Sequence, residues 1–212
     1  MLTLHTYWRS SAAYRVRIAL EHKHLAWSAI PINLQAGAQR DPAYLARNPQ
    51  GFVPMLEDGS TRITQSLAII EYLEERHPAP PLLPESPALR AQVRSMAALI
   101  ACDIHPLNNL RVTRYLRDEL GQPPERVERW IRHWISEGLS ALEALLVPAS
   151  AFLCGDRVSI ADVCLLPQLY NAERFGCDLS GCPQVRTIGA RLAALPAFAA
   201  AHPDRQPDAP AR

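Results

Sequence analysis

The apolar residues at the start of the chain change their spacing from two residues to about four, and this change constrains the fold more than any other feature. Leu2 and Leu4 alternate with polar neighbours, which is typical of a half-buried strand. Val16 and Leu20 then lie four residues apart, as apolar residues do on one face of an amphipathic helix. The chain is therefore predicted to begin with a strand over residues 2–7, followed by a polar turn and a helix.

Three polar residues, Arg9, Ser10 and Ser11, lie just before this helix, which is expected to open at about Ala12. Either serine can cap the helix, because a serine hydroxyl accepts a hydrogen bond from a backbone N–H of the first turn. The other N–H groups and the helix dipole favour an anion there: a phosphate, a carboxylate or a thiolate. A nucleotide phosphate is disfavoured because the chain has neither a GxGxxG nor a GxxxxGKS/T loop. The competing interpretation is that both serines are caps and nothing more.

The rest of the first half continues as an α/β domain. A second strand is predicted over residues 26–34, and a strand–helix–strand connection of this length implies a parallel, right-handed βαβ unit. Asp58-Gly59 lies between residues 53–57 and residues 61–63, an arrangement that indicates a β-hairpin. A helix is expected to begin at residues 64–66. This order, βαβ followed by ββα, predicts a thioredoxin-like domain over residues 1–77.

Residues 78–87 separate this domain from a second one of different character. The stretch HPAPPLLPESP has five prolines in eleven residues, so it is expected to be a stiff linker. The proline-rich tail from Ala201 is expected to be disordered. We predict an all-α domain over residues 88–212. Its helical patterns cover residues 89–120 (with a kink or break at Pro106), 125–146, 160–175 and 185–195.

Composition narrows the kinds of protein that this chain can be. A formal net charge of +1 argues against a general polyanion binder, so no nucleic-acid partner is expected. No apolar run reaches the roughly 18 residues of a membrane span, so no membrane partner is expected. The five cysteines are odd in number and scattered, which is typical of a reducing cytoplasm. Cys177 and Cys182 have no histidine at ligand spacing, so no metal is expected.

Five motifs stand out along the chain: SSAAYRVRIAL from Ser10, NPQGFVPML from Asn48, QSLAIIEYLEE from Gln65, DIHPLNNLRV from Asp103 with NAERF from Asn171, and GDRVSIADV from Gly155. They resemble those of zeta-class glutathione transferases, a group that includes maleylpyruvate and maleylacetoacetate isomerases. Ala12 departs from the family, which often has cysteine there. The resemblance covers almost the whole chain. It implies glutathione as the cofactor, a homodimer, and a cytoplasmic isomerase of aromatic-compound catabolism.

The resemblance also assigns residues to glutathione. Ser10 is the hydroxyl nearest the sulfur, with Ser11 beside it. A free thiol has a pKa of about 8.5, and lowering it by ~2 units takes roughly 2.7 kcal/mol, which a helix dipole and a hydroxyl hydrogen bond together supply. The Val53 backbone before a cis Pro54 is expected at the cysteinyl part, and Gln50 at the glycyl end. Gln65 and Ser66 lie at another predicted helix N-terminus, which suits the γ-glutamyl carboxylate; an ordinary N-cap is the alternative and needs the same geometry. Asp103 is expected at the ammonium across a dimer interface. His105 and Asn109 are further candidates, for which helix packing or capping beside Pro106 is the alternative.

Three arginines are predicted to bind the substrate. Arg9 adjoins the two serines, Arg111 lies on the first long helix of the second domain, and Arg174 lies in NAERF. Matching arginines of the family line a basic pocket over the sulfur. Maleylpyruvate and maleylacetoacetate are dianions, and planar guanidinium groups suit their carboxylates. The competing interpretation is that these arginines are solvated surface groups.

The reaction implied by the resemblance is a glutathione-dependent cis–trans isomerisation. The thiolate adds to the cis double bond, the resulting single bond rotates, and elimination gives the fumaryl product and returns glutathione. The likeness to bacterial enzymes favours maleylpyruvate over maleylacetoacetate as the substrate. Two rivals stay open. One is a general zeta-class transferase that dehalogenates small α-halo acids, and the other is a non-catalytic module that retains the fold for protein contacts.

Overall fold

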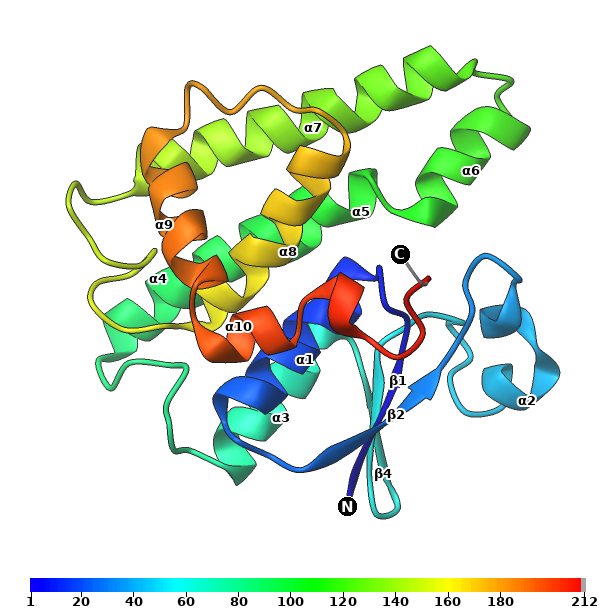
Figure 1. The fold of residues 1–212 in the computed structure, drawn as a ribbon, viewed down its shortest axis with the longest axis horizontal. Coiled ribbons are helices and arrows are strands. Elements are labelled where there is room, and N and C mark those ends of the chain that lie inside the picture. The colour runs from blue at the N-terminus through cyan, green and yellow to red at the C-terminus, as the bar shows by residue number, and fades with distance from the viewer. Residues whose placement is uncertain (211–212) are drawn as a thin grey trace. The chain divides into compact units, whose positions relative to one another are not determined.

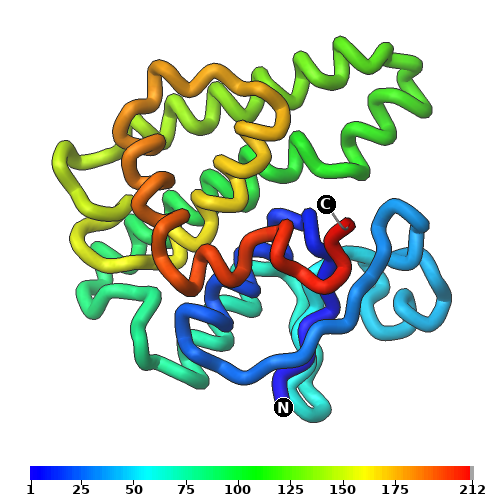
Figure 2. The backbone as a smooth tube through the Cα atoms, viewed as in Figure 1, coloured from blue at the N-terminus to red at the C-terminus, as the bar shows by residue number. Residues whose placement is uncertain are grey.

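The structure is a computed structural model that describes residues 1–210. It divides into two compact units. The first is Met1–Pro81 together with the C-terminal segment from Ala194, and the second is Leu82–Ala193. Figures 1 and 2 follow the chain through both units, from the blue N-terminus to the red C-terminus.

The first unit is built on a four-stranded mixed sheet with the strand order β2-β1-β3-β4. Its central strand β1 (Leu2–Thr6) runs parallel to β2 (Trp27–Pro31) and antiparallel to β3 (Met55–Asp58). β3 pairs antiparallel with β4 (Thr61–Thr64). The predicted thioredoxin-like arrangement, a parallel βαβ unit followed by a β-hairpin and a helix, is therefore confirmed.

Two long helices of this unit, α1 (Ser11–His22) and α3 (Ser66–Arg76), pack against each other. They lie side by side in Figure 1. α1 is buried along nearly its whole length, and its side chains Val16, Ile18 and Leu20 belong to the core. The short helices η1 (Ala38–Arg40) and α2 (Pro42–Leu45) lie in the connection between β2 and β3.

The C-terminal segment corrects two expectations from the sequence. It was expected to end the helical domain and to be disordered from Ala201, but it packs on the first unit through α10 (Pro196–Ala200) and the turn η3 (Pro203–Arg205). Phe198 is fully buried, and its carbonyl accepts a hydrogen bond from the Tyr14 hydroxyl at 3.3 Å. A proline-rich composition indicates irregular backbone, but it does not show whether another part of the chain packs against that backbone and orders it, as the first unit does here.

The second unit is helical, as predicted. Apart from one isolated bridge between Phe152 and Gly155, its described residues form no strand. α4 packs on α8, and α7 packs on α9. The elements are α4 (Pro87–Ala98), the π-helical turn η2 (Leu99–Ile104), α5 (His105–Leu107), α6 (Leu110–Asp118), α7 (Pro124–Leu145), α8 (Ile160–Arg174) and α9 (Pro183–Ala193).

The helix predicted over residues 89–120 is divided differently from the expectation. α4 passes into the π-helical turn, and the chain then breaks at Asn108–Asn109 rather than at Pro106. Pro106 lies in the first turn of α5, where a missing backbone N–H costs little. Arg111, which was expected on the first long helix, lies on the separate short helix α6.

Among residues 1–210, no helix combines the length and apolar character needed to span a bilayer.

Candidate functional site

The turn between β1 and α1 places Ser10 as the cap of α1. The Ser10 hydroxyl accepts a hydrogen bond from the Ala13 N–H at 3.2 Å, and the Ser10 carbonyl accepts one from the Tyr14 N–H at 2.8 Å. Ser11 is the first residue of the helix and is buried. Because a serine hydroxyl that accepts a hydrogen bond still has its own hydrogen to donate, Ser10 can cap the helix and bind an anion at once.

Arg9 lies beside this cap, with its guanidinium carbon 5.1 Å from the centre of the Trp8 ring. The backbone before it is held by Arg17 of α1, which is completely buried. Arg17 donates hydrogen bonds to the carbonyls of Tyr7 (3.3 Å) and Trp8 (2.9 Å). Burial lowers the pKa of Arg17 to about 10, so the guanidinium stays charged at neutral pH. The approach to the α1 N-terminus is thus built around a fixed positive charge.

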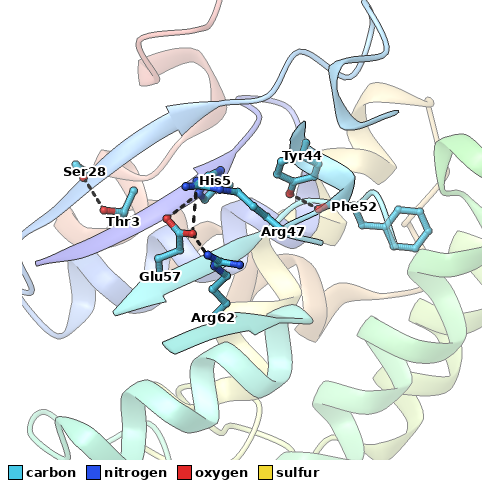
Figure 3. Close-up of polar contacts among 8 residues, drawn as sticks. All are labelled: Thr3, His5, Ser28, Tyr44, Arg47, Phe52, Glu57 and Arg62. Atoms are coloured by element: carbon cyan, nitrogen blue, oxygen red, sulfur yellow. Dashed lines mark hydrogen bonds and ion pairs between the residues drawn. The ribbon is translucent and has the colours of Figure 1, made fainter. Parts of the chain in front are cut away.

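The backbone just before Val53 is fixed by two side chains from the α2 region. The Tyr44 hydroxyl and the Asn48 amide both donate to the Phe52 carbonyl, at 2.5 and 2.7 Å. Figure 3 shows Tyr44 pointing at Phe52. The Val53–Pro54 peptide that follows is cis, as the resemblance implied. Burial raises the pKa of Tyr44, which keeps its hydroxyl proton available for this bond.

An ionic network below this loop links three strands (Figure 3). The Glu57 carboxylate of β3 lies 3.2 Å from His5 of β1, 3.2 Å from Arg62 of β4 and 3.5 Å from Arg47, which follows α2. Burial opposes ionisation of Glu57, but its interactions with His5, Arg47 and Arg62 outweigh burial and lower the pKa of Glu57. The network ties the chain after α2 to the sheet.

A second helix N-terminus, that of α3, brings together residues that the sequence predicted separately. The Gln65 amide donates to the Gln50 side-chain oxygen at 2.8 Å, and Gln65 has a φ of 70°. A non-glycine residue in this region is strained by roughly 1–3 kcal/mol, and such residues gather at functional sites. Ser66 accepts a hydrogen bond at 3.2 Å from Arg15 of α1, which is buried. The structure therefore adds a buried cation to this predicted anion site.

Arg15 and Arg17 were not among the residues predicted for the site. Their position carried a signal that went unused. Both lie on α1 among buried apolar residues, where an arginine is rarely placed unless it is hydrogen bonded. Arg15 contacts Ser66, a residue of the predicted site, and Arg17 contacts Trp8, the residue before Arg9.

In the second unit, the predicted residues lie near the break between α5 and α6 and at the end of α8. Asn109 caps α6 by accepting a hydrogen bond from the Arg111 N–H at 3.1 Å, so the capping alternative for Asn109 describes its contact. Arg111 is exposed in the first turn of α6. Asp103 is exposed in η2, and His105 begins α5.

Arg174 is the last residue of α8, and its guanidinium carbon lies 4.5 Å from the centre of the Phe175 ring. One turn earlier, the buried Asn171 amide donates to the Asn108 side-chain oxygen at 3.4 Å. This bond fastens the end of α8 to the turn that precedes Arg111. The sequence did not single out Asn108 or Asn171, because an asparagine within a helical pattern gives no sign of its partner.

Comparison with known proteins agrees with this arrangement. The model for the N-terminal domain of glutathione S-transferases matches residues 4–81, and the model for their C-terminal domain matches residues 124–200. The maleylacetoacetate isomerase of Pseudomonas aeruginosa is 51% identical over 213 residues, which cover 99% of this chain and all of the relative.

Two solved structures have nearly the same fold. The holo structure of a maleylpyruvate isomerase, described as a bacterial zeta-class glutathione S-transferase, has a TM-score of 0.96 at 40% identity and covers 98% of this chain and 100% of its own. The maleylacetoacetate isomerase of Methylobacterium extorquens AM1, with bound malonate and glutathione, has a TM-score of 0.95 at 46% identity and covers 99% and 100%. The predicted zeta-class resemblance is confirmed, and the chain belongs to the glutathione S-transferase family.

Proposed function

We propose that this protein is a glutathione-dependent cis–trans isomerase that converts maleylacetoacetate or maleylpyruvate into the fumaryl isomer. The observation that carries the proposal is the α1 N-terminus. There the Ser10 hydroxyl retains a hydrogen to donate, and Arg9 lies next to it in the chain. The α1 N-terminus with Ser10 thus offers a site for a thiolate, and the neighbouring Arg9 offers a positive charge for a substrate carboxylate. The similar protein from Methylobacterium extorquens AM1 binds both glutathione and malonate, a small dicarboxylate.

The residues of the first unit fit glutathione. The charge of Arg15, the Ser66 hydroxyl at 3.2 Å from it and the strained Gln65 form a site suited to the γ-glutamyl carboxylate. Gln50, hydrogen bonded to Gln65, is proposed for the glycyl end. The backbone of Val53, which follows the fixed Phe52 carbonyl, is proposed to bind the cysteinyl part.

Glutathione supplies the thiol that adds to the substrate double bond and leaves again after the bond has rotated. The protein's part is electrostatic. Ser10 and the N-terminus of α1 stabilise the thiolate, with Ser11 beside them. Arg9, Arg111 and Arg174 are proposed to hold the substrate carboxylates and to stabilise the negative charge that develops on the carbonyl oxygen. No side chain is needed as a nucleophile.

The choice of substrate changes from the sequence-based preference. Maleylpyruvate was favoured, but the maleylacetoacetate isomerase of Pseudomonas aeruginosa is 51% identical to this chain, against 40% for the zeta-class maleylpyruvate isomerase. We therefore propose maleylacetoacetate as the first substrate to test.

The remaining proposals concern the assembly and its location. We propose a homodimer in which Asp103 approaches the glutathione ammonium of the other subunit, with His105 and Asn109 as further ligand contacts. We also propose a cytoplasmic location, since the five cysteines Cys102, Cys154, Cys164, Cys177 and Cys182 are all free thiols.

The test measures the loss of maleylacetoacetate and maleylpyruvate absorbance with glutathione at catalytic concentration, beside chloride release from dichloroacetate. We expect isomerisation to dominate, and Ser10→Ala to lower kcat/KM by about 10- to 100-fold, because a hydrogen bond to a charged sulfur is lost. Ser28→Ala is the control, since the Ser28 hydroxyl bonds Thr3 within the sheet. Equal or faster dehalogenation would favour the general transferase. No turnover and no glutathione binding would favour the non-catalytic module.

A further inference from the structure

The backbone N–H of Trp8 donates a hydrogen bond to the Asp208 carboxylate at 2.9 Å, across 200 positions of sequence. Trp8 is the residue before Arg9 and lies two residues before Ser10. Asp208 is half-buried, and the C-terminal segment that carries it belongs to the same compact unit as Trp8. A residue from the far end of the chain therefore contacts the turn on which the proposed chemistry depends.

Arg17 binds the backbone of the same residue, Trp8, through its carbonyl. Its guanidinium donates to the Trp8 carbonyl at 2.9 Å and to the Ala201 carbonyl at 3.2 Å. Asp208 is also close enough for its negative charge to favour the charged form of this buried arginine. Both polar backbone groups of Trp8 are thus occupied, the N–H by Asp208 and the carbonyl by Arg17. Together they define the direction in which the chain enters α1.

The segment that carries Asp208 is itself anchored at several points. Phe198 is fully buried, and its carbonyl accepts from the Tyr14 hydroxyl at 3.3 Å. The Gln206 amide donates to the carbonyls of Ala200 (3.3 Å) and His202 (3.0 Å). In Figure 1 the red C-terminal segment runs past α1. Asp208 is therefore held in place by its own segment.

This contact matters for chemistry because the turn is short. A hydroxyl and a guanidinium act on a reacting centre only when they are correctly placed, and an error of about 1 Å can cost roughly 100-fold in rate. Nothing within residues 8–10 is regular secondary structure that would fix the direction of the Arg9 and Ser10 side chains. Ser10 is held by its bonds to α1 and by the bond from its N–H to the Tyr7 carbonyl at 3.0 Å, and the backbone of Trp8 is held by Arg17 and Asp208.

We propose that Asp208 is a positioning residue for the isomerisation. By holding the Trp8 N–H, it sets the backbone that presents Arg9 and the Ser10 hydroxyl. This rests on the proposed function, since it assigns Arg9 and Ser10 to that reaction. Asp208 itself touches neither glutathione nor substrate in this proposal.

The kinetic test compares Asp208→Ala, Asp208→Asn and the control Asp204→Ala, which removes an exposed carboxylate from the same segment. We expect Asp208→Ala to lower kcat/KM for isomerisation by about 10-fold or more. We expect Asp208→Asn to restore part of the lost kcat/KM, because an amide oxygen can accept the hydrogen bond from the same Trp8 N–H. The control keeps wild-type kinetics. Wild-type kinetics in Asp208→Ala, or no rescue by Asp208→Asn, would overturn the positioning role.

A second measurement separates this proposal from the proposed function. Hydrogen exchange at the Trp8 amide reports the contact without any turnover, and we expect faster exchange in Asp208→Ala than in wild type or Asp204→Ala. Unchanged exchange would overturn the contact. An inactive wild-type protein in which Asp208→Ala still accelerates exchange would count against the isomerase assignment. An active wild type with unchanged Asp208→Ala kinetics would count only against Asp208.

Discussion

Arg174 ends α8, and its guanidinium lies over the Phe175 ring. We predict that Arg174→Ala lowers kcat/KM for the maleyl substrate by about 10-fold or more and leaves the KM for glutathione unchanged, because the lost contact is to a substrate carboxylate. Arg174→Lys should recover only part of the lost kcat/KM, since the lysine ammonium lacks the planar guanidinium group that binds a carboxylate through two hydrogen bonds.

Steady-state kinetics with each substrate varied in turn measure this split. Arg186→Ala, an exposed arginine on α9, is the control. An Arg174→Ala enzyme that changed only the KM for glutathione would contradict the role in substrate binding.

Gln65 combines strain with a predicted ligand contact, so its two properties can be separated by substitution. Gln65→Gly removes the amide and relieves the positive φ, whereas Gln65→Ala removes the amide and keeps the strain. We predict that both variants raise the KM for glutathione, while only Gln65→Gly raises the free energy of unfolding, by about 1 kcal/mol. Urea unfolding beside glutathione titration measures both. Wild-type glutathione affinity in both variants would contradict the assignment.

Residues could be predicted for the candidate site where a local sequence pattern indicates a role. Ser10 and Gln65 precede helices, so their neighbourhood could be deduced from capping rules. Arg15, Arg17, Asn108, Asn171 and Asp208 could not be found in this way. Their roles depend on partners that are distant in sequence, such as Trp8 for Asp208 and Ser66 for Arg15.

The π-helical turn η2 approaches α7 closely at Gly138. A Cβ on Gly138 would overlap the Cγ1 and Cδ1 atoms of Ile104, a buried residue of η2. Glycine to alanine in a helix interior normally stabilises by up to about 1 kcal/mol. We predict that Gly138→Ala instead lowers the free energy of unfolding by about 1–3 kcal/mol, because the packed side chain must move. Thermal unfolding checks the sign, and an increase in stability would contradict the close packing.

Asp162 begins α8 as a buried carboxylate that accepts from the Leu153 N–H (2.9 Å), the Ser159 N–H (2.8 Å) and the Ser159 hydroxyl (2.7 Å). Burial outweighs these bonds and raises its pKa from 3.8 to about 6. Between these values the folded state binds a proton that the unfolded state does not. The contribution of Asp162 to stability is therefore full below pH 4 and is lost as pH rises through 6.

Raising the pKa of Asp162 from 3.8 to about 6 corresponds to a change of ~3 kcal/mol in the free energy of unfolding. We predict that the difference in free energy of unfolding between wild type and Asp162→Asn changes by about this amount from pH 4 to pH 7, because asparagine does not titrate. Urea unfolding at several pH values measures it. A difference that did not vary with pH would show that Asp162 has an ordinary pKa.

Most elements followed from periodicity and from turn chemistry. β1, α1 and the hairpin at Asp58-Gly59 are specified by residues within each element, so their prediction needed no partner. The π-helical turn η2 and the folding of the C-terminal segment were not predicted, because each depends on a neighbouring surface, that of α7 for η2 and that of α1 for α10.

At the scale of the whole molecule, the chain is a glutathione S-transferase whose first unit assembles the predicted cofactor residues at two helix N-termini. α1 contributes Ser10 and Ser11, and α3 contributes Ser66 next to Gln65. Within this unit, the sulfur and the γ-glutamyl carboxylate are thus each assigned to the positive end of a helix. In the second unit, the elements that carry the predicted substrate arginines are joined through Asn108 and Asn171.

The most direct test of the central claim is the pKa of the glutathione thiol when it is bound to the intact protein, followed through the ultraviolet absorbance of the thiolate as pH is varied. Wild type should lower this pKa by ~2 units from its ordinary value of about 8.5, and Ser10→Ala should lose most of that shift while glutathione still binds. A bound thiol that titrates like free glutathione, or an undiminished shift in Ser10→Ala, would contradict the account.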